Sequence, residues 1–220
     1  MKNRLFDVEC RQCPRLAAFL REVRENHPDY HARPVPPFGD GDPDLLIVGL
    51  APGMHGANAT GRPFTGDYAG ILLYDTLYRH GFSDRPVSES ADDGLRLRGC
   101  RITNAVKCLP PQNKPLGEEV RTCNTYLMEE LAALKAGAVI LALGTVAHQA
   151  VLRALGLRLK DYPFGHGREH PLAEGRLLVD SYHCSRYNTQ TRRLTEAMFH
   201  DLFASIRRRI DAEDTRAEYV

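Results

Sequence analysis

Four short apolar runs, separated by segments with helical periodicity, restrict the fold of this chain more than any other feature. The runs are Asp44-Leu-Leu-Ile-Val-Gly49, Arg101-Ile-Thr-Asn-Ala-Val106, Ala138-Val-Ile-Leu-Ala-Leu143 and Arg176-Leu-Leu-Val-Asp-Ser181. Their composition and length are typical of strands buried on both faces. Helical patterns lie at 14–25, 69–80, 116–135, 144–155 and 190–209. This alternation predicts an α/β fold, a three-layer α/β/α sandwich with a central, mainly parallel four-stranded sheet.

The size of the chain suits a single domain. With 220 residues, of which 43% are hydrophobic, it can fill one sizeable core. We expect one domain over 1–209 and a polar, flexible tail over 210–220. The protein is expected to be a monomer.

The net charge of the chain is too small to create a strong electrostatic field around the whole molecule. Lys and Arg number 29 against 28 Asp and Glu, which gives a formal charge of +1, so nucleic-acid binding would require a local basic patch. The stretch 181–193 is such a patch, with three arginines and no acid. No apolar run approaches the ~20 residues of a membrane-spanning helix, and residues 1–10 lack the apolar stretch of a signal peptide. These patterns predict a cytoplasmic protein with no membrane partner.

The loop after the first run contains the first candidate site residues. In parallel sheets ligands bind at the carboxyl ends of the strands, and here residues 49–67 hold five glycines in nineteen positions. Neither of the common phosphate-binding glycine motifs is present. The loop instead offers Phe64 and Asp67. The alternatives are core packing for Phe64 and an N-cap of the following helix for Asp67.

The loops after the second and fourth runs add polar candidates. Asn104 and Asn113 can each present a donor and an acceptor, the pattern needed to read a pyrimidine edge, although Asx-turns are the commoner use of asparagine in loops. His183 can donate a hydrogen bond to a developing anion, with a structural histidine as the alternative.

The cysteines indicate a metal centre rather than disulfides. Six cysteines in a chain of this length are too few for a secreted disulfide scaffold. Cys10 and Cys13 form a C-x2-C pair, and Cys108 and Cys123 complete four thiolates that suit zinc or an iron–sulfur cluster. The absence of a second C-x2-C favours the cluster. The remaining two are interpreted as a buried small hydrophobe, Cys100, and a loop residue, Cys184.

One histidine pair has a metal-like spacing. His166 and His170 are separated by three residues, but the glycine-rich segment around them makes this a weak signal.

Five ordered motifs together identify a family. They are Cys10-Arg-Gln-Cys-Pro, Gly49-Leu-Ala-Pro-Gly-Met-His-Gly-Ala-Asn, Thr60-Gly-Arg-Pro-Phe-Thr-Gly-Asp67, Val106-Lys-Cys-Leu-Pro-Pro-Gln-Asn-Lys-Pro115 and Ser181-Tyr-His-Cys-Ser-Arg-Tyr-Asn-Thr-Gln-Thr. From about Cys10 to about Leu202, the chain resembles the iron–sulfur uracil-DNA glycosylases, in particular their type-B branch, the fifth family of the superfamily.

The resemblance implies a fold, an activity and a cofactor. The fold is the α/β/α glycosylase fold, with a structural [4Fe–4S] cluster held by an N-terminal cluster-binding segment and the region after the second strand. The implied ligands are Cys10, Cys13, Cys108 and Cys123. The implied activity is monofunctional removal of uracil, and of other deaminated bases such as hypoxanthine and xanthine, from DNA by base flipping, which initiates base excision repair.

The resemblance also implies roles for individual residues in base binding. Phe64 would stack on the extruded base, Asn104 and Asn113 would lie in or beside the pocket, and the backbone from Gly49 through Leu50 to Ala51 would line it. Ser185, Arg186, Tyr187 and Asn188 would contact DNA.

His183 would stabilise the leaving base, and Asp67 would orient a water or stabilise the sugar cation. Leu50 and Ala51 stand where other branches carry a polar, water-activating residue, so catalysis is expected to rely on Asp67 and His183.

Three further positions depart from the pattern. Cys184 replaces a common proline, Tyr187 replaces the leucine that wedges into the base stack, and Asn104 is not a fixed feature of the branch.

Two other functions fit parts of the sequence. A non-catalytic iron–sulfur or zinc protein that binds nucleic acid would need neither Asp67 nor His183. A nucleotide-binding α/β protein of metabolism agrees with the glycine-rich loop but lacks the phosphate-binding motif.

Overall fold

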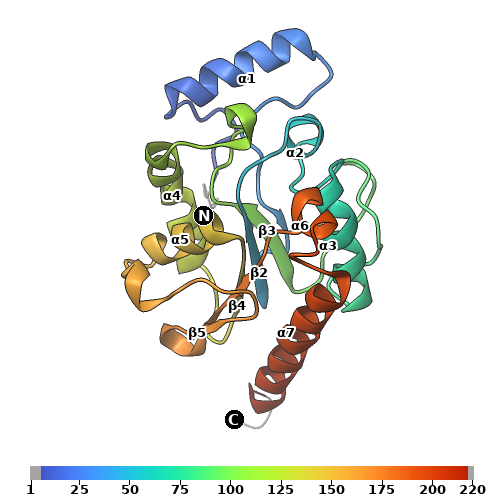
Figure 1. Cartoon of the computed structure of the whole chain (residues 1–220), viewed down its shortest axis with the longest axis vertical. Helices are drawn as coiled ribbons and strands as arrows, with labels where there is room; N and C mark the ends of the chain where they lie inside the picture. The colour runs from blue at the N-terminus through green and yellow to red at the C-terminus, as the bar shows by residue number, and fades with distance from the viewer. Residues whose placement is uncertain (1–5, 218–220) are drawn as a thin grey trace.

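A computed structural model of the chain describes residues 6–217 and shows one sheet flanked by helices (Figure 1). Within those residues the sheet has six strands in the order β1-β3-β2-β4-β6-β5. They are β1 (Phe38–Gly39), β2 (Leu45–Gly49), β3 (Cys100–Asn104), β4 (Val139–Leu143), β5 (Glu169–Pro171) and β6 (Leu177–Ser181). The central pairs β3–β2, β2–β4 and β4–β6 are all parallel. The mainly parallel α/β sheet predicted from the sequence is therefore confirmed.

The prediction of four strands was incomplete. The structure adds the edge strands β1 and β5, which pair antiparallel with β3 and β6. β1 spans two residues and β5 three, and Pro171 ends the latter. Such short edges lack the continuous apolar run of a buried strand, so hydrophobic patterning does not detect them.

The five longer helices follow the predicted segments, and the two short helices α2 and α6 were not predicted. They are α1 (Pro14–Asn26), α2 (Ala57–Thr60), α3 (Tyr68–Arg79), α4 (Gly117–Ala132), α5 (Thr145–Ala154), α6 (Arg186–Gln190) and α7 (Glu196–Ala217), with 3-10 turns at Pro111–Asn113, Leu159–Asp161 and Ala173–Gly175. The helix expected at 190–209 is α7, which begins only at Glu196 and is separate from α6. Arg192 adopts a left-handed conformation (φ +56°) between them, and the Thr195 hydroxyl accepts from the Met198 amide where α7 begins.

Helix α7 also extends beyond its expected end. The sequence predicted a flexible tail from residue 210, whereas the structure continues the helix through Ala217; residues 218–220 lie outside the described residues. Ile206 and Ile210 are 3% and 4% exposed and continue the apolar stripe of α7 into the core. This packing stabilises the helix past the predicted boundary.

Two hydrophobic cores confirm the three layers. Along β2, Leu45 and Ile47 pack with α3 and α7 on one face, while Leu46 and Val48 pack with α1, α4 and α5 on the other. Successive strand residues point to opposite faces, so a strand covered on both sides is apolar throughout. The parallel strands all end at one edge of the sheet, where the loops after β2, β3 and β6 meet. Within residues 6–217, no helix is long and apolar enough to cross a membrane.

Candidate functional site

A pocket of about 400 Å³ lies where these three loops meet. Its volume falls within the range of small-molecule sites. It is lined by Leu50, Ala51, Gly53, Ala57, Phe64, Asp67, Tyr68, Ala69, Asn104, Asn113, His183, Ser185 and Arg186. The structure thus places most of the residues singled out from the sequence around one space, although they come from loops far apart in the chain.

Asn104 lines the pocket, whereas Gly49 does not line it and instead packs against Asn104 and Phe64. A Cβ on Gly49 would overlap Asn104 Oδ1 and would come 2.8 Å from the Phe64 ring, so only glycine fits at the end of β2. Asn104 is 3% exposed, and its Oδ1 has no hydrogen-bond partner among the described residues. A buried acceptor without a donor is destabilising. A ligand that brings an N–H group to this atom would relieve that cost.

Phe64 is both a core residue and part of the pocket wall. It is 5% exposed, and its ring lies alongside that of His183, with centroids 5.8 Å apart and planes 26° apart. Its backbone is left-handed (φ +55°), which is uncommon for an aromatic residue. Gly70 accommodates this turn, because a Cβ there would overlap the Phe64 carbonyl oxygen.

Asp67 combines the two roles that the sequence left open. It is the N-cap of α3, where its Oδ1 accepts from the Gly70 amide at 3.0 Å, and it also lines the pocket. Burial raises the pKa of its carboxyl, and hydrogen bonds from the Gly70 and Ala69 amides oppose this shift. The carboxylate is therefore held in place and partly desolvated, an arrangement common to catalytic acids and bases.

His183 is a neutral hydrogen-bonding group in the pocket wall. Burial lowers the pKa of its imidazole to about 4, so the ring carries no charge near neutral pH. Its carbonyl oxygen accepts from Asn188 Nδ2 at 2.8 Å, and the Ser185 hydroxyl caps α6 by accepting from the Asn188 amide at 3.4 Å. Ser185 and Asn188, which the resemblance assigns to DNA contacts, thus also fix the loop that carries His183.

The rim of the pocket contains aromatic and basic side chains. The Arg186 guanidinium lies over the Tyr68 ring, 5.0 Å from its centroid, whereas the neighbouring Tyr187 does not line the pocket and is 71% exposed. Asn113 is exposed at the rim in a left-handed turn (φ +56°). Sequence reasoning missed Tyr68, although its position directly after Asp67 at the start of a predicted helix was the available signal.

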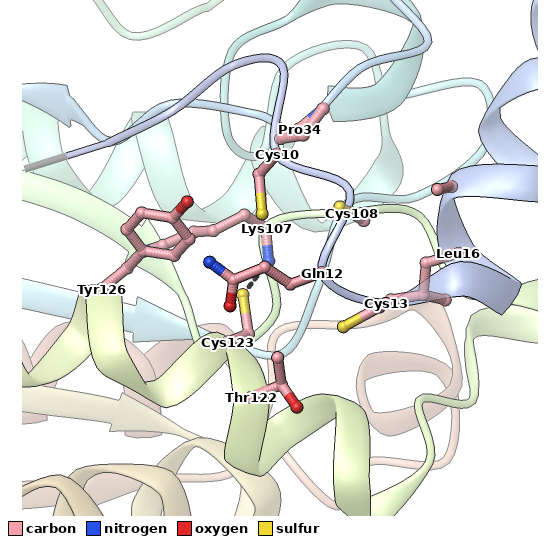
Figure 2. A pocket seen from close by; sticks show the side chains of 11 residues that line it. Cys10, Gln12, Cys13, Leu16, Pro34, Lys107, Cys108, Thr122, Cys123 and Tyr126 are labelled. Carbon is pink, nitrogen blue, oxygen red and sulfur yellow. Dashed lines mark hydrogen bonds between the residues drawn. The ribbon is translucent and has the colours of Figure 1, made fainter.

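The four candidate cysteine ligands line a second, separate pocket. Figure 2 shows the sulfurs of Cys10, Cys13, Cys108 and Cys123 arranged around a common space beside Leu16 and Tyr126. They come from the segment before α1, the loop after β3, and α4. The Lys107 amide donates to Cys123 Sγ at 3.2 Å, a contact often found at metal-bound sulfur. Cys100 and Cys184 lie elsewhere and are both fully buried; Cys100 is in β3, and Cys184 is in the loop after β6, as the sequence predicted.

The donor set fits a metal that binds four thiolates. Burial, followed by the neighbouring Cys123, raises the pKa of Cys13 to about 11, and burial also raises the pKa values of Cys108 and Cys123. Positive charge from a bound metal would favour the thiolate forms. Four such ligands suit an iron–sulfur cluster or a structural zinc ion.

The fold and the site together define a class of protein. It is a three-layer α/β protein with a carboxylate and a neutral imidazole in one pocket, and it has a separate group of four cysteines. Residues 36–207 match the family described as the uracil DNA glycosylase superfamily, and the chain belongs to this superfamily. The motif resemblance is thereby confirmed at the level of the superfamily.

Curated relatives extend over most of the chain. It is 48% identical over 204 residues to the type-5 uracil-DNA glycosylase of Thermus thermophilus, covering 90% of this chain and 93% of the relative. The type-5 enzyme of Pyrobaculum aerophilum is 46% identical over 197 residues, covering 88% and 84%. The type-4 uracil-DNA glycosylase of the same organism is 36% identical over 150 residues, covering 68% and 62%.

Proposed function

We propose that this protein is a monofunctional DNA glycosylase that removes uracil, and also hypoxanthine and xanthine, from DNA. The observation that carries the proposal is the convergence of Asp67, His183 and the unpartnered Asn104 oxygen on one pocket. Superfamily membership and the names of the type-5 relatives support it. Because the glycosidic bond is shielded inside a duplex, the nucleotide must first be flipped out into the pocket.

Asn104 would recognise the uracil edge. Uracil presents an N–H donor at N3 beside a carbonyl acceptor at O4, which complements the Oδ1 and Nδ2 of one side-chain amide. Cytosine presents an acceptor at N3 and would leave Asn104 Oδ1 without a donor. Phe64 would supply a stacking surface beside this edge.

His183 and Asp67 would divide the charge that develops when the bond breaks. The leaving base becomes an anion, and a neutral imidazole N–H from His183 can stabilise it. The sugar becomes cation-like, and the Asp67 carboxylate can stabilise it or orient the attacking water. Leu50 and Ala51 line the pocket and have no side-chain group that could activate a water.

The exposed loop after β6 would hold the DNA. Arg186 at the rim can contact a phosphate, with Ser185 and Asn188 nearby, and the exposed Tyr187 ring can wedge or stack where the flipped nucleotide leaves the helix. DNA affinity is expected to be modest and salt-sensitive, because the acid-free basic stretch 181–193 is short and holds three arginines.

A [4Fe–4S] cluster on Cys10, Cys13, Cys108 and Cys123 would be the structural cofactor. When bound, it would join the N-terminal segment to the loop that carries Asn113. Four cysteine thiols that stay reduced until the metal binds require a reducing compartment, so we place the protein in the cytoplasm. We expect it to act as a monomer.

Strand cleavage at abasic sites tests the proposed activity. Purified protein is incubated with duplexes that carry one uracil or one hypoxanthine, and the products are treated with alkali. We expect a break at the uracil and at the hypoxanthine. DNA binding without any break on either substrate would favour the alternative, a non-catalytic iron–sulfur or zinc protein that binds nucleic acid.

Replacing Asn104 with Ala tests the role of the unpartnered amide. Two neutral hydrogen bonds of about 1 kcal/mol each predict a loss of roughly 10- to 30-fold in uracil excision. Hypoxanthine excision should fall by a similar factor, because that base presents the same pattern, an N–H donor at N1 beside a carbonyl acceptor at O6. Single-turnover rates on both substrates measure the loss, and unchanged rates on both would contradict a role in recognition.

A further inference from the structure

Three buried side chains form a cluster outside both pockets, on the β6 side of the sheet. His148 belongs to α5, His170 to β5 and Asp180 to β6, and their exposed fractions are 2%, 6% and 0%. One nitrogen or oxygen atom from each lies within 4.8 Å of the other two. The weak sequence signal paired His170 with His166, but His166 instead stacks on Tyr182 with ring centroids 5.2 Å apart.

The hydrogen bonds of His148 require an explanation. Its Nδ1 lies 2.7 Å from Asp180 Oδ1, and its Nε2 lies 2.8 Å from the Tyr162 carbonyl oxygen. Both ring nitrogens face acceptors, whereas a neutral imidazole has a single N–H group. Either a second proton or a cation between Nδ1 and Asp180 must satisfy this arrangement.

We propose that His148 Nδ1, His170 Nε2 and the Asp180 carboxylate bind one divalent transition-metal ion of the zinc class. Two histidines and one carboxylate are an established ligand set for zinc. His170 Nε2 is already 3.1 Å from Asp180 Oδ2. Metal–ligand distances of about 2.0–2.2 Å require only a small separation of His148 Nδ1 from Asp180 Oδ1.

The surroundings of the cluster match those of a bound metal. A metal-bound histidine usually donates its other N–H to a carbonyl or carboxylate, as His148 Nε2 would to Tyr162. The Gly165 amide donates to Asp180 Oδ2 at 3.2 Å and orients the carboxylate. The ion would also supply countercharge to the fully buried Asp180 carboxylate.

The position of the site indicates a structural role. The Gly167 amide donates to the Asp180 carbonyl oxygen at 2.8 Å, and the Asp180 amide donates to the Arg168 carbonyl oxygen at 2.9 Å, so the loop after α5 already lies against β6. An ion at Asp180 would clamp this loop to the strand that leads to His183. This inference does not depend on the proposed glycosylase activity.

Cobalt titration of the purified protein tests the site. Co²⁺ is added after chelator treatment, and its visible absorption distinguishes nitrogen and oxygen ligands from the cysteine centre, which would add thiolate-to-cobalt charge transfer. We expect one equivalent bound without that charge transfer in the wild type and in the control His166→Gln. The His170→Gln and Asp180→Asn variants should not bind this equivalent of Co²⁺. No such binding in the wild type, or equal binding in all variants, would overturn the proposal and leave a cluster held by protons alone.

X-ray absorption on zinc-loaded wild-type protein provides a second test that needs no variant. Nitrogen and oxygen scatterers with an imidazole pattern would support the site, whereas a shell of sulfur alone would overturn it. Zinc should also raise the melting temperature of the wild type and His166→Gln proteins but not of His170→Gln.

Discussion

Replacing Asp67 with Asn is expected to slow uracil excision by about 10²- to 10⁴-fold, the usual contribution of a positioned acid or base. Asparagine caps helices about as well as aspartate, so the hydrogen bond to Gly70 and the start of α3 should persist while the charge is lost. DNA binding should remain. Single-turnover excision and fluorescence anisotropy on the same duplex separate the two effects.

Asp67→Ala and His183→Ala extend this test. The alanine variant of Asp67 also loses the helix cap, at a cost of about 1 kcal/mol, so its melting temperature should fall where that of Asp67→Asn does not. His183→Ala should lose about 10²- to 10³-fold, as expected for one donor to a developing anion. Wild-type rates in Asp67→Ala and His183→Ala would show that the roles are misassigned.

The pH dependence distinguishes the two groups. The Asp67 pKa is raised by burial, and its anionic form is the active one, so excision should be present above that pKa and lost as the pH falls through it. His183, with a pKa of about 4, stays neutral over most of this range. Rate–pH profiles should show an acid limb above the usual range of a carboxyl in the wild type and no such limb in Asp67→Asn. The same limb in both would assign it to another group.

The central sheet was predictable because its strands are buried on both faces. Each forms a continuous apolar run whose composition reports the burial directly. The edge strands β1 and β5 and the break before α7 were not predictable in this way, because they depend on contacts with distant residues. Nothing local to Phe38 indicates that it pairs with Ile102.

The site was predictable to the extent that it follows the strand ends. Asn104 and the loops that carry Asp67 and His183 follow buried runs, and parallel strands bring their carboxyl ends together. The inward contacts of Asn188 were not visible, since they depend on the fold of the loop. The cluster of His148 and Asp180 spans 32 residues and joins a helix to a strand, so no local spacing reveals it.

Replacing Cys108 with Ala is expected to remove the iron and to unfold the cluster region locally. Wild-type protein should be brown, with absorbance at about 400 nm from thiolate-bound iron, and the variant colourless. Excision should fall to background, because the loop from Cys108 also carries Asn113 to the pocket rim. Iron content and absorbance measure the first effect, and the alkaline cleavage assay measures the second. If the wild-type protein is colourless and active and contains zinc, the proposal of an iron–sulfur cluster is wrong.

The loss should stay local because other contacts hold the surrounding elements. Lys107 Nζ pairs with Glu130 Oε1 at 2.6 Å, with both side chains at most 2% exposed, and this ion pair joins the loop after β3 to α4 without the cluster. Hydrogen exchange should therefore lose protection at 6–14 and 108–116 while β4 and β6 keep theirs. Cys100→Ala is the matched control, because Cys100 is buried in the core on the α3 and α7 face of the sheet, away from the four cysteine ligands. The Cys100→Ala protein should keep its iron. Global unfolding of Cys108→Ala would show that the cluster, rather than the two cores, dominates stability.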